Sequence, residues 1–216
     1  MTTGAIRPAR EADRAALYDV CVRTGDAGND ASAMLDDPSL YGHLYAGQYL
    51  TFAPEFALVL EVGSEVAGYA VGVIDSAEFE DRLEREWWPP LRSRYPLPAS
   101  GPASGSVSGS VLDRVLIERI HRPYRTDERL ASRYPSHLHI DLLPAAQGHG
   151  HGRALMDSLF ERFAAAGSRG VHLGVDPRND AAIRFYEHLG LRRHDPDGGV
   201  LFTQRFDSPE VAQRNP

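Results

Sequence analysis

The apolar positions of the chain fall into two kinds of run, and the shorter, continuous runs predict β-strands. Residues 56–62 and 66–74 are rich in Val and other apolar residues, and the pair Gly63-Ser64 separates them. A two-residue turn that begins with glycine suits a β-hairpin, so these strands are predicted to pair antiparallel. Further strands are predicted at Ala5 and Ile6 on a sheet edge, and over 137–143, 171–175, 191–195 and 199–206.

The second kind of run has helical spacing. Leu155, Leu159 and Phe163 lie at i, i+4 and i+8 and predict an amphipathic helix. Helices are also predicted over 10–23, 38–51, 78–94, 111–120, 127–133 and 180–189. Pro89 and Pro90 are expected to stop the helix over 78–94 or to turn it into irregular chain, because proline has no amide hydrogen.

The segment 96–110 differs from the rest in composition, since Pro, Gly, Ser and Ala dominate it. Such a composition cannot build a core, so a flexible loop is predicted within a single domain of residues 1–216. The alternation of strands and helices along the remaining chain predicts a mixed α/β sheet.

Charge and composition narrow the class of function. The chain has 30 acidic against 23 basic residues and a formal net charge of −7, which argues against nonspecific nucleic-acid binding. All the basic residues are Arg. With no apolar run of about 18 residues and a polar start, neither a membrane span nor a secretory signal is predicted, and a cytoplasmic protein is expected. Cys21, the only cysteine, is predicted to be a buried inert thiol, with a nucleophile as the alternative.

A glycine-rich turn follows the 137–143 strand and opens the next helix. It consists of Gln147, Gly148, His149, Gly150, His151, Gly152 and, in the first helical turn, Arg153. The first amides of a helix have no intrahelical partner, and glycines let an anion approach the main chain, so the turn predicts a phosphate site, with a flexible turn as the alternative. Its spacing fits neither a P-loop, which ends in Gly-Lys-Ser/Thr, nor the dinucleotide motif Gly-x-Gly-x-x-Gly.

Two separated motifs resemble the GNAT superfamily of acyl-CoA-dependent N-acetyltransferases. The first is Gln147-x-x-Gly150-x-Gly152 after a strand, and the second is NDAAIRFYEHLGL at 179–191. The resemblance implies an α/β (α+β) fold with a mostly antiparallel twisted sheet, a splayed parallel strand pair and flanking helices. It also implies acetyl-CoA as co-substrate and a small-molecule or protein amine as acceptor, and leaves the oligomeric state open.

Most of the chain is also similar to the acetyltransferase-like domain at the C-terminal end of animal O-GlcNAc hydrolases and to free-standing bacterial relatives of that domain. The similar segments are 67–72, Trp87-Trp88-Pro89, 134–136 and 167–170. In the animal domain the acyl-CoA loop is degraded, whereas here it is intact. An active N-acetyltransferase is therefore the leading hypothesis, and a non-catalytic acyl-CoA-binding or interaction domain is the alternative.

The GNAT resemblance also implies roles for individual residues. Tyr186 would protonate the departing CoA thiolate, although a core aromatic is the alternative reading. An amide of Leu142 or Leu143 would polarise the acetyl carbonyl. The cofactor contacts implied are Leu142, Leu143, Gln147, Gly148, His149, Gly150, His151, Gly152, Arg153, Asn179 and Tyr186.

An amine acceptor is mostly protonated at neutral pH, so direct attack on a thioester requires a base. His139 and Asp141 are the candidates, because residues two apart on a strand share a face. Purely structural hydrogen bonding by both residues is the alternative.

The loop 24–30 contains three polar residues, Asp26, Asn29 and Asp30, that are candidates for acceptor binding or for helix capping. The pairs His137/His139 and His149/His151 raise the question of a metal. Because no cysteine accompanies them and one pair lies in the anion loop, no metal site is predicted.

Overall fold

The computed structural model describes residues 4–97, 110–196 and 198–206, so the predicted flexible loop at 96–110 lies largely outside the described residues. Within them one seven-stranded sheet has the order β1-β2-β3-β4-β5-β7-β6. Its strands are β1 (Gly4–Pro8), β2 (Ala57–Val62), β3 (Glu65–Val73), β4 (Ser136–Leu142), β5 (Gly170–Val175), β6 (Arg192–His194) and β7 (Val200–Arg205). Neighbours pair antiparallel except β4 and β5, which are parallel. The predicted mixed, mostly antiparallel sheet is confirmed.

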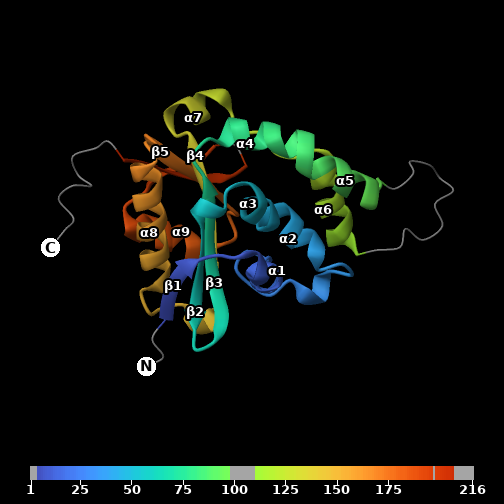
Figure 1. The fold of residues 1–216 in the computed structure, drawn as a ribbon, viewed down its shortest axis with the longest axis horizontal. Helices are drawn as coiled ribbons and strands as arrows, with labels where there is room; N and C mark the ends of the chain where they lie inside the picture. The colour runs from blue at the N-terminus through green and yellow to red at the C-terminus, as the bar shows by residue number, and fades with distance from the viewer. Residues whose placement is uncertain (1–3, 98–109, 197, 207–216) are drawn as a thin grey trace.

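Helices pack on both sides of this sheet (Figure 1). They are α1 (Arg14–Arg23), α2 (Ser39–Tyr45), α3 (Gly47–Phe52), α4 (Ser76–Arg82), α5 (Trp88–Arg94), α6 (Val111–His121), α7 (Glu128–Arg133), α8 (His151–Ala165) and α9 (Asp180–Leu189). In Figure 1, α8 and α9 lie to one side of β2 and β3, and α1 to α6 lie to the other. The predicted face of α8 is buried, with Leu155, Leu159 and Phe163 fully enclosed in the core.

The single helix predicted over 38–51 is in fact two helices, α2 and α3, with a break at Ala46. Gly42 and Gly47 lie against the ring of Tyr18, and a Cβ on either glycine would come within 2.1–2.2 Å of that side chain. The close packing of Tyr18 therefore requires glycines here. Glycine weakens a helix, and the break falls directly beside Gly47.

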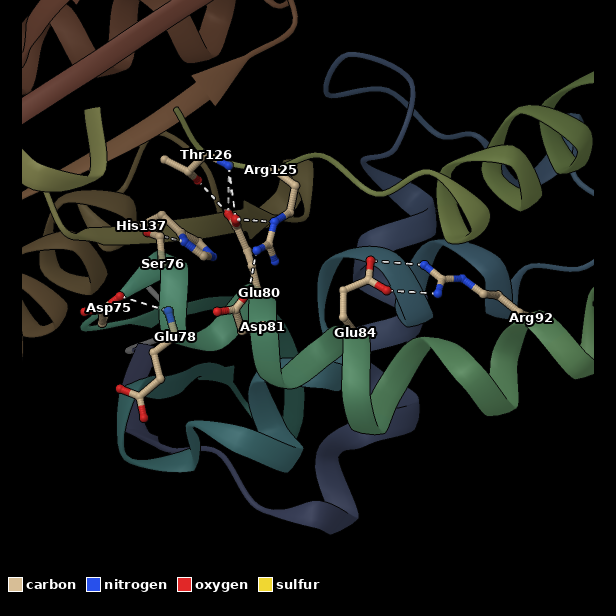
Figure 2. A network of polar contacts seen from close by, with 10 residues as sticks. All are labelled: Asp75, Ser76, Glu78, Glu80, Asp81, Glu84, Arg92, Arg125, Thr126 and His137. Atoms are coloured by element: carbon tan, nitrogen blue, oxygen red, sulfur yellow. Dashed lines mark hydrogen bonds and ion pairs between the residues drawn. The ribbon is translucent and has the colours of Figure 1, made fainter. Parts of the chain in front are cut away.

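The prediction that Pro89-Pro90 would end the preceding helix is wrong. The helical path continues from α4 through a π-helical turn, Leu83–Trp87, into α5. The prolines occupy the first turn of α5, where a missing amide hydrogen costs little. Glu84 in the π-turn bonds Arg92 through both carboxylate oxygens, at 2.9 and 3.1 Å, and so bridges the proline pair (Figure 2).

β4 and β5 separate soon after they meet. Their pairing is limited to Ser136 with Val171 and His137 with His172, although β4 continues to Leu142. Along β3, in contrast, β4 stays paired up to Leu142. The predicted splayed parallel pair is therefore present, and one edge of β4 is left open beyond His137.

None of the helices in the described ranges is long and apolar enough to cross a membrane.

Candidate active site

A cavity of about 890 Å³ lies between the end of β4, the start of α8 and the length of α9. The two motifs singled out in the sequence therefore meet in one place. Of the residues proposed for the cofactor or for catalysis, those that line this cavity are Asp141, Leu142, Gln147, Gly148, Gly150, Gly152, Arg153, Asn179 and Tyr186.

The glycine loop presents open main chain to this cavity. Gly148 and Gly150 have positive φ angles of 77° and 82°, and a Cβ at either would meet nothing within 4 Å. The first hydrogen bond of α8 runs from the amide of Ala154 to the carbonyl of Gly150. In the described part of the chain the amides of residues 148–153 have no partner, and unpaired amides at a helix start are the kind of donor that binds anions.

The two amides proposed at the end of β4 differ in availability. The Leu143 amide donates to the carbonyl of Ala67 at 2.9 Å, so Leu143 offers no free donor, contrary to the expectation for it. Amides alternate between the two edges of a strand, so the Leu142 amide points to the opposite edge, which β5 has left. Gln147 donates to the Leu142 carbonyl at 2.8 Å and holds the loop against the strand end.

The histidines of the loop do not line the cavity. His149 is exposed, and the ring of His151 turns towards β1, where a Cβ on Gly4 would lie 2.6 Å from the His151 Cε1 atom. Their side chains therefore have no place in the candidate site, and only their main-chain amides remain available there.

Tyr186 is packed as a core aromatic and also lines the cavity. Its ring is buried against Phe185 and Phe202, with ring centroids 5.2 and 5.3 Å away. Its hydroxyl has no hydrogen-bond partner among the described residues, and the side chain lines the cavity. Burial, together with the nearby Asp141 carboxylate, raises the pKa of Tyr186, so the hydroxyl keeps its proton at neutral pH.

His139 and Asp141 form a hydrogen-bonded dyad. Asp141 Oδ2 accepts from the Tyr69 hydroxyl at 2.6 Å and lies 2.9 Å from His139 Nε2. A carboxylate only accepts, so Nε2 carries the hydrogen, and in the neutral imidazole the lone pair is on Nδ1. Tyr45 stacks on the imidazole at 5.4 Å and fixes its plane. This arrangement is that of a base oriented by a carboxylate.

Cys21 belongs to the same cluster, although it is far away in the sequence. Its Sγ atom and ligand atoms of His139 and Asp141 lie within 4.8 Å of one another. Burial, and secondarily the Asp141 charge, raise the pKa of the Cys21 thiol well above its ordinary value. A thiol that stays protonated is a poor nucleophile and a poor metal ligand, which supports the inert reading.

Tyr69 and Tyr45 were not singled out in the sequence. Tyr69 faces Asp141 because β3 and β4 pair antiparallel with these two residues opposite each other. A correct register between the predicted strands would have revealed Tyr69. Tyr45 comes from a separate helix, and no local pattern marks it.

A second cavity, of about 350 Å³, extends from His139 between α2, α3, α4, α6 and the strands β4 and β5. Aromatic rings form much of its wall: Tyr45, Tyr49, Phe79, Trp88 and Tyr124. Trp88 is buried there, whereas the Trp87 indole donates to the His43 carbonyl at 3.0 Å.

His137, also on the wall of the second cavity, is a neutral histidine with a defined tautomer. Ser76 Oγ donates its hydrogen to the Pro135 carbonyl at 2.7 Å, so His137 Nδ1 must donate to Ser76 Oγ at 2.8 Å (Figure 2). His137 Nε2 then accepts from the Tyr49 hydroxyl at 2.9 Å. Burial, followed by the neighbouring His172 and His139, lowers the pKa of His137 to about 3.

We expect this buried histidine to make the protein sensitive to acid. The pKa of His137 is lower in the folded state, so between its ordinary value of 6.5 and about 3 the unfolded state binds more protons. The free energy of unfolding should therefore fall as pH falls through this window. Urea unfolding at pH 7.5 and pH 5 should show a smaller loss for His137→Asn than for wild type. Equal losses in both proteins would contradict this, and an exposed His188→Asn variant serves as the control.

The loop at 24–30 lies beside the first cavity, not the second. Asn29 lines the first cavity, and Asp26 pairs with Arg178 at 3.0 Å. Asp30 accepts from the amide of Ser32 at 2.8 Å in an Asx turn, one residue before Ala31, which is the N-cap of the short 3₁₀ helix Ser32–Met34 and has no side-chain cap bond. Asp26 is thus held near the start of α9 through Arg178, and Asn29 lines the same cavity.

An open strand edge beside a parallel partner, followed by a glycine loop and a helix start, defines an acyl-CoA-dependent acyltransferase fold. The family model for the acetyltransferase (GNAT) family matches residues 30–191, and the chain belongs to this family.

Several known proteins are similar to this chain in sequence or in structure. The structure called SsHAT is 34% identical, with a TM-score of 0.83 over 95% of this chain and all of that one. Protein O-GlcNAcase of Rattus norvegicus is 25% identical over 185 residues, or 86% of this chain, which spans about a fifth (20%) of that protein's length. The structure of yncA from Salmonella typhimurium with its cofactor acetyl-CoA is 20% identical with a TM-score of 0.53 over 95% of each chain, which shows a shared fold.

Proposed function

We propose that this protein transfers the acetyl group of acetyl-CoA to an amine by direct attack. The observation that carries the proposal is the meeting of unpaired loop amides, the open edge of β4, the Tyr186 hydroxyl and the Asp141 carboxylate in one cavity. In this proposal the loop amides bind the anionic part of the co-substrate, and Tyr186 and the His139–Asp141 dyad transfer protons.

The residues present fit acetyl-CoA, which supplies an acetyl group activated as a thioester. The amides of residues 148–153 and the Arg153 side chain would hold the pyrophosphate. The free Leu142 amide would bind the pantetheine arm or the acetyl carbonyl in the manner of an added strand. Asn179 caps α9 through Oδ1, which leaves its Nδ2 group, beside Gly28, free to donate.

The His139–Asp141 dyad would remove a proton from the amine. His139 Nδ1 accepts the proton of the attacking ammonium or amine, and Asp141 holds the imidazole by Nε2 and stabilises its charged form. The buried Tyr69 hydroxyl in turn fixes the Asp141 carboxylate. His139 therefore acts as the base in this proposal, and Asp141 orients it.

Tyr186 would supply the proton that the departing thiolate requires. Tyr186→Phe is expected to lower kcat by roughly 10²-fold, because a positioned general acid typically contributes about 10²–10⁴-fold. The dissociation constant for acetyl-CoA should stay within about twofold, since the ring packing is retained. Thiol release with the best acceptor of an amine panel measures kcat, and calorimetry measures binding. Full activity in the variant would remove Tyr186 from the mechanism.

The proposal as a whole is tested by calorimetric titration with acetyl-CoA, followed by mass spectrometry of products from a broad amine panel. Micromolar or tighter binding together with N-acetylated products is expected. Binding without any product would favour the non-catalytic acyl-CoA-binding domain. No binding at all would overturn the acetyltransferase assignment.

A further inference from the structure

We propose that the second cavity binds the acceptor, and that this acceptor is a small amino carboxylate, an amine with an apolar or aromatic body and a carboxylate group. The inference rests on the proposed function, because it assigns the substrate of the same site. Four features of the cavity support the inference. They are its connection to His139, its largely aromatic wall, the Arg119 guanidinium without a protein partner, and the Gln48 side-chain oxygen without a hydrogen-bond partner in the described residues.

The cavity starts at the base. His139 lines the second cavity, while its partner Asp141 lines the first, so the dyad joins the two spaces. His139 Nδ1 has no hydrogen-bond partner within the described residues, and the side chain is 34% exposed. An amine in the second cavity could therefore give its proton to Nδ1 while it faces a thioester in the first.

Aromatic and other uncharged side chains form most of the cavity wall apart from Glu80 and Arg119. Tyr49 and Trp88 are buried, and Tyr45 and Phe79 complete an aromatic surface that suits an aliphatic or aromatic body. His137 is neutral, for the reasons given above. A volume of about 350 Å³ is at the lower end for small-molecule sites, which favours a small substrate.

The acidic residue on the wall, Glu80, already has hydrogen-bond and ion-pair partners within the protein. Glu80 accepts from the Thr126 amide with both oxygens at 3.1 Å, from the Thr126 hydroxyl at 2.6 Å, and pairs with Arg125 at 3.7 Å (Figure 2). It ties the α6–α7 connection to α4. Glu80 is thus compensated by the protein and is not a counter-ion for a ligand ammonium.

The arginine on the wall, Arg119, has no partner among the described residues. Arg119 is exposed, lines the cavity and acts electrostatically on Tyr45, yet it has neither a hydrogen bond nor an ion pair with any residue that the structure describes. Tyr124, 65% exposed, also lines the cavity, so both residues lie at its solvent side. A guanidinium at the entrance of an apolar cavity matches a carboxylate.

Gln48 lines the cavity and contains a buried hydrogen-bond acceptor without a partner in the described part of the protein. The residue is 3% exposed, its Nε2 group donates to the Leu44 carbonyl, and its Oε1 atom has no partner in the described part of the protein. A buried acceptor without a partner is costly, so a ligand N–H that reaches it would be favoured. An ammonium or amine group provides such a donor, whereas a purely apolar ligand does not.

The experiment compares matched pairs of amines that differ only in a carboxylate: phenylalanine with phenethylamine, tryptophan with tryptamine, and lysine with cadaverine. Mass spectrometry of products gives kcat/KM with acetyl-CoA, and calorimetry gives binding of each amine to the full chain. In wild type at least one carboxylated member should be preferred by roughly 10- to 100-fold, the value of a charge-assisted hydrogen bond. Arg119→Gln should remove this preference. Arg122→Gln, an exposed arginine that does not line the cavity, should keep it.

The outcomes separate this inference from the proposed function. Turnover of amines without preference for the carboxylated member, or with a preference that survives in Arg119→Gln, overturns the inference and leaves the acetyltransferase intact. Arg119-dependent binding without product retains the cavity assignment and overturns the acetyltransferase. Neither binding nor turnover of any pair, or turnover confined to lysine within peptides, overturns the inference.

Discussion

Replacing Gly150 with glutamate is expected to abolish measurable binding of acetyl-CoA, with a loss of at least about 100-fold in affinity. Gly150 has a φ of 82° and precedes α8 amides that lack partners in the described chain. A glutamate would strain the main chain there and place a negative charge where phosphates should bind. Losing two charge-assisted hydrogen bonds alone accounts for roughly 3 kcal/mol or more, which is about 100-fold. Calorimetric titration of the variant measures this.

Gly167→Glu is the matched control. Gly167 has a φ of 83°, its Cβ position is equally open, and it lies just beyond the other end of the same helix. The backbone strain is therefore similar, but the phosphate site is untouched, so binding should persist. Wild-type affinity in Gly150→Glu would show that the glycine loop is not the anion site. Loss of binding in both variants would point to damage of α8 instead.

Asp141→Asn is expected to lower kcat/KM by roughly 10²–10⁴-fold, the range of general-base contributions. Asp141 Oδ2 accepts from both Tyr69 and His139, so the amide oxygen of the asparagine takes this position and keeps both bonds. The amide carries no charge, however, and no longer stabilises the imidazolium that forms when His139 takes a proton. Binding of acetyl-CoA and the thermal unfolding midpoint should change little, because the substitution keeps shape. Steady-state kinetics with an accepted amine is the measurement.

Tyr69→Phe tests whether this effect comes from the dyad. The variant removes one hydrogen bond to Asp141 but keeps the contact between Asp141 and His139. Its loss of kcat/KM should stay below about tenfold, since only the orientation of the carboxylate weakens. An Asp141→Asn enzyme as active as wild type would assign Asp141 a structural role only.

Much of the fold follows from patterns within short segments. The hairpin of β2 and β3 follows from two apolar runs around Gly63, and the buried face of α8 follows from helical spacing. The glycine loop is equally local, because three glycines after a strand already dictate open amides at a helix start. These features need no knowledge of distant contacts.

The rest depends on contacts between distant segments. Cys21, Tyr69 and His139 come from three separate elements, and only the assembled sheet brings them together. The side-chain packing of Tyr18 decides where α2 ends, and a π-turn decides that the helix passes Pro89. Such choices depend on tertiary packing, which overrides local propensity.

The position of β4 between the two cavities affects how substrate preference can change among proteins with this fold. Among the described elements it is the strand that contributes residues to both cavities: Asp141 and Leu142 to the first, and His139 to the second. The remaining walls come from different parts of the chain. In the proposed assignment of acetyl-CoA to the first cavity and the acceptor to the second, mutations in α2 to α6 reshape the acceptor site alone. Substrate preference can then evolve without a loss of cofactor affinity.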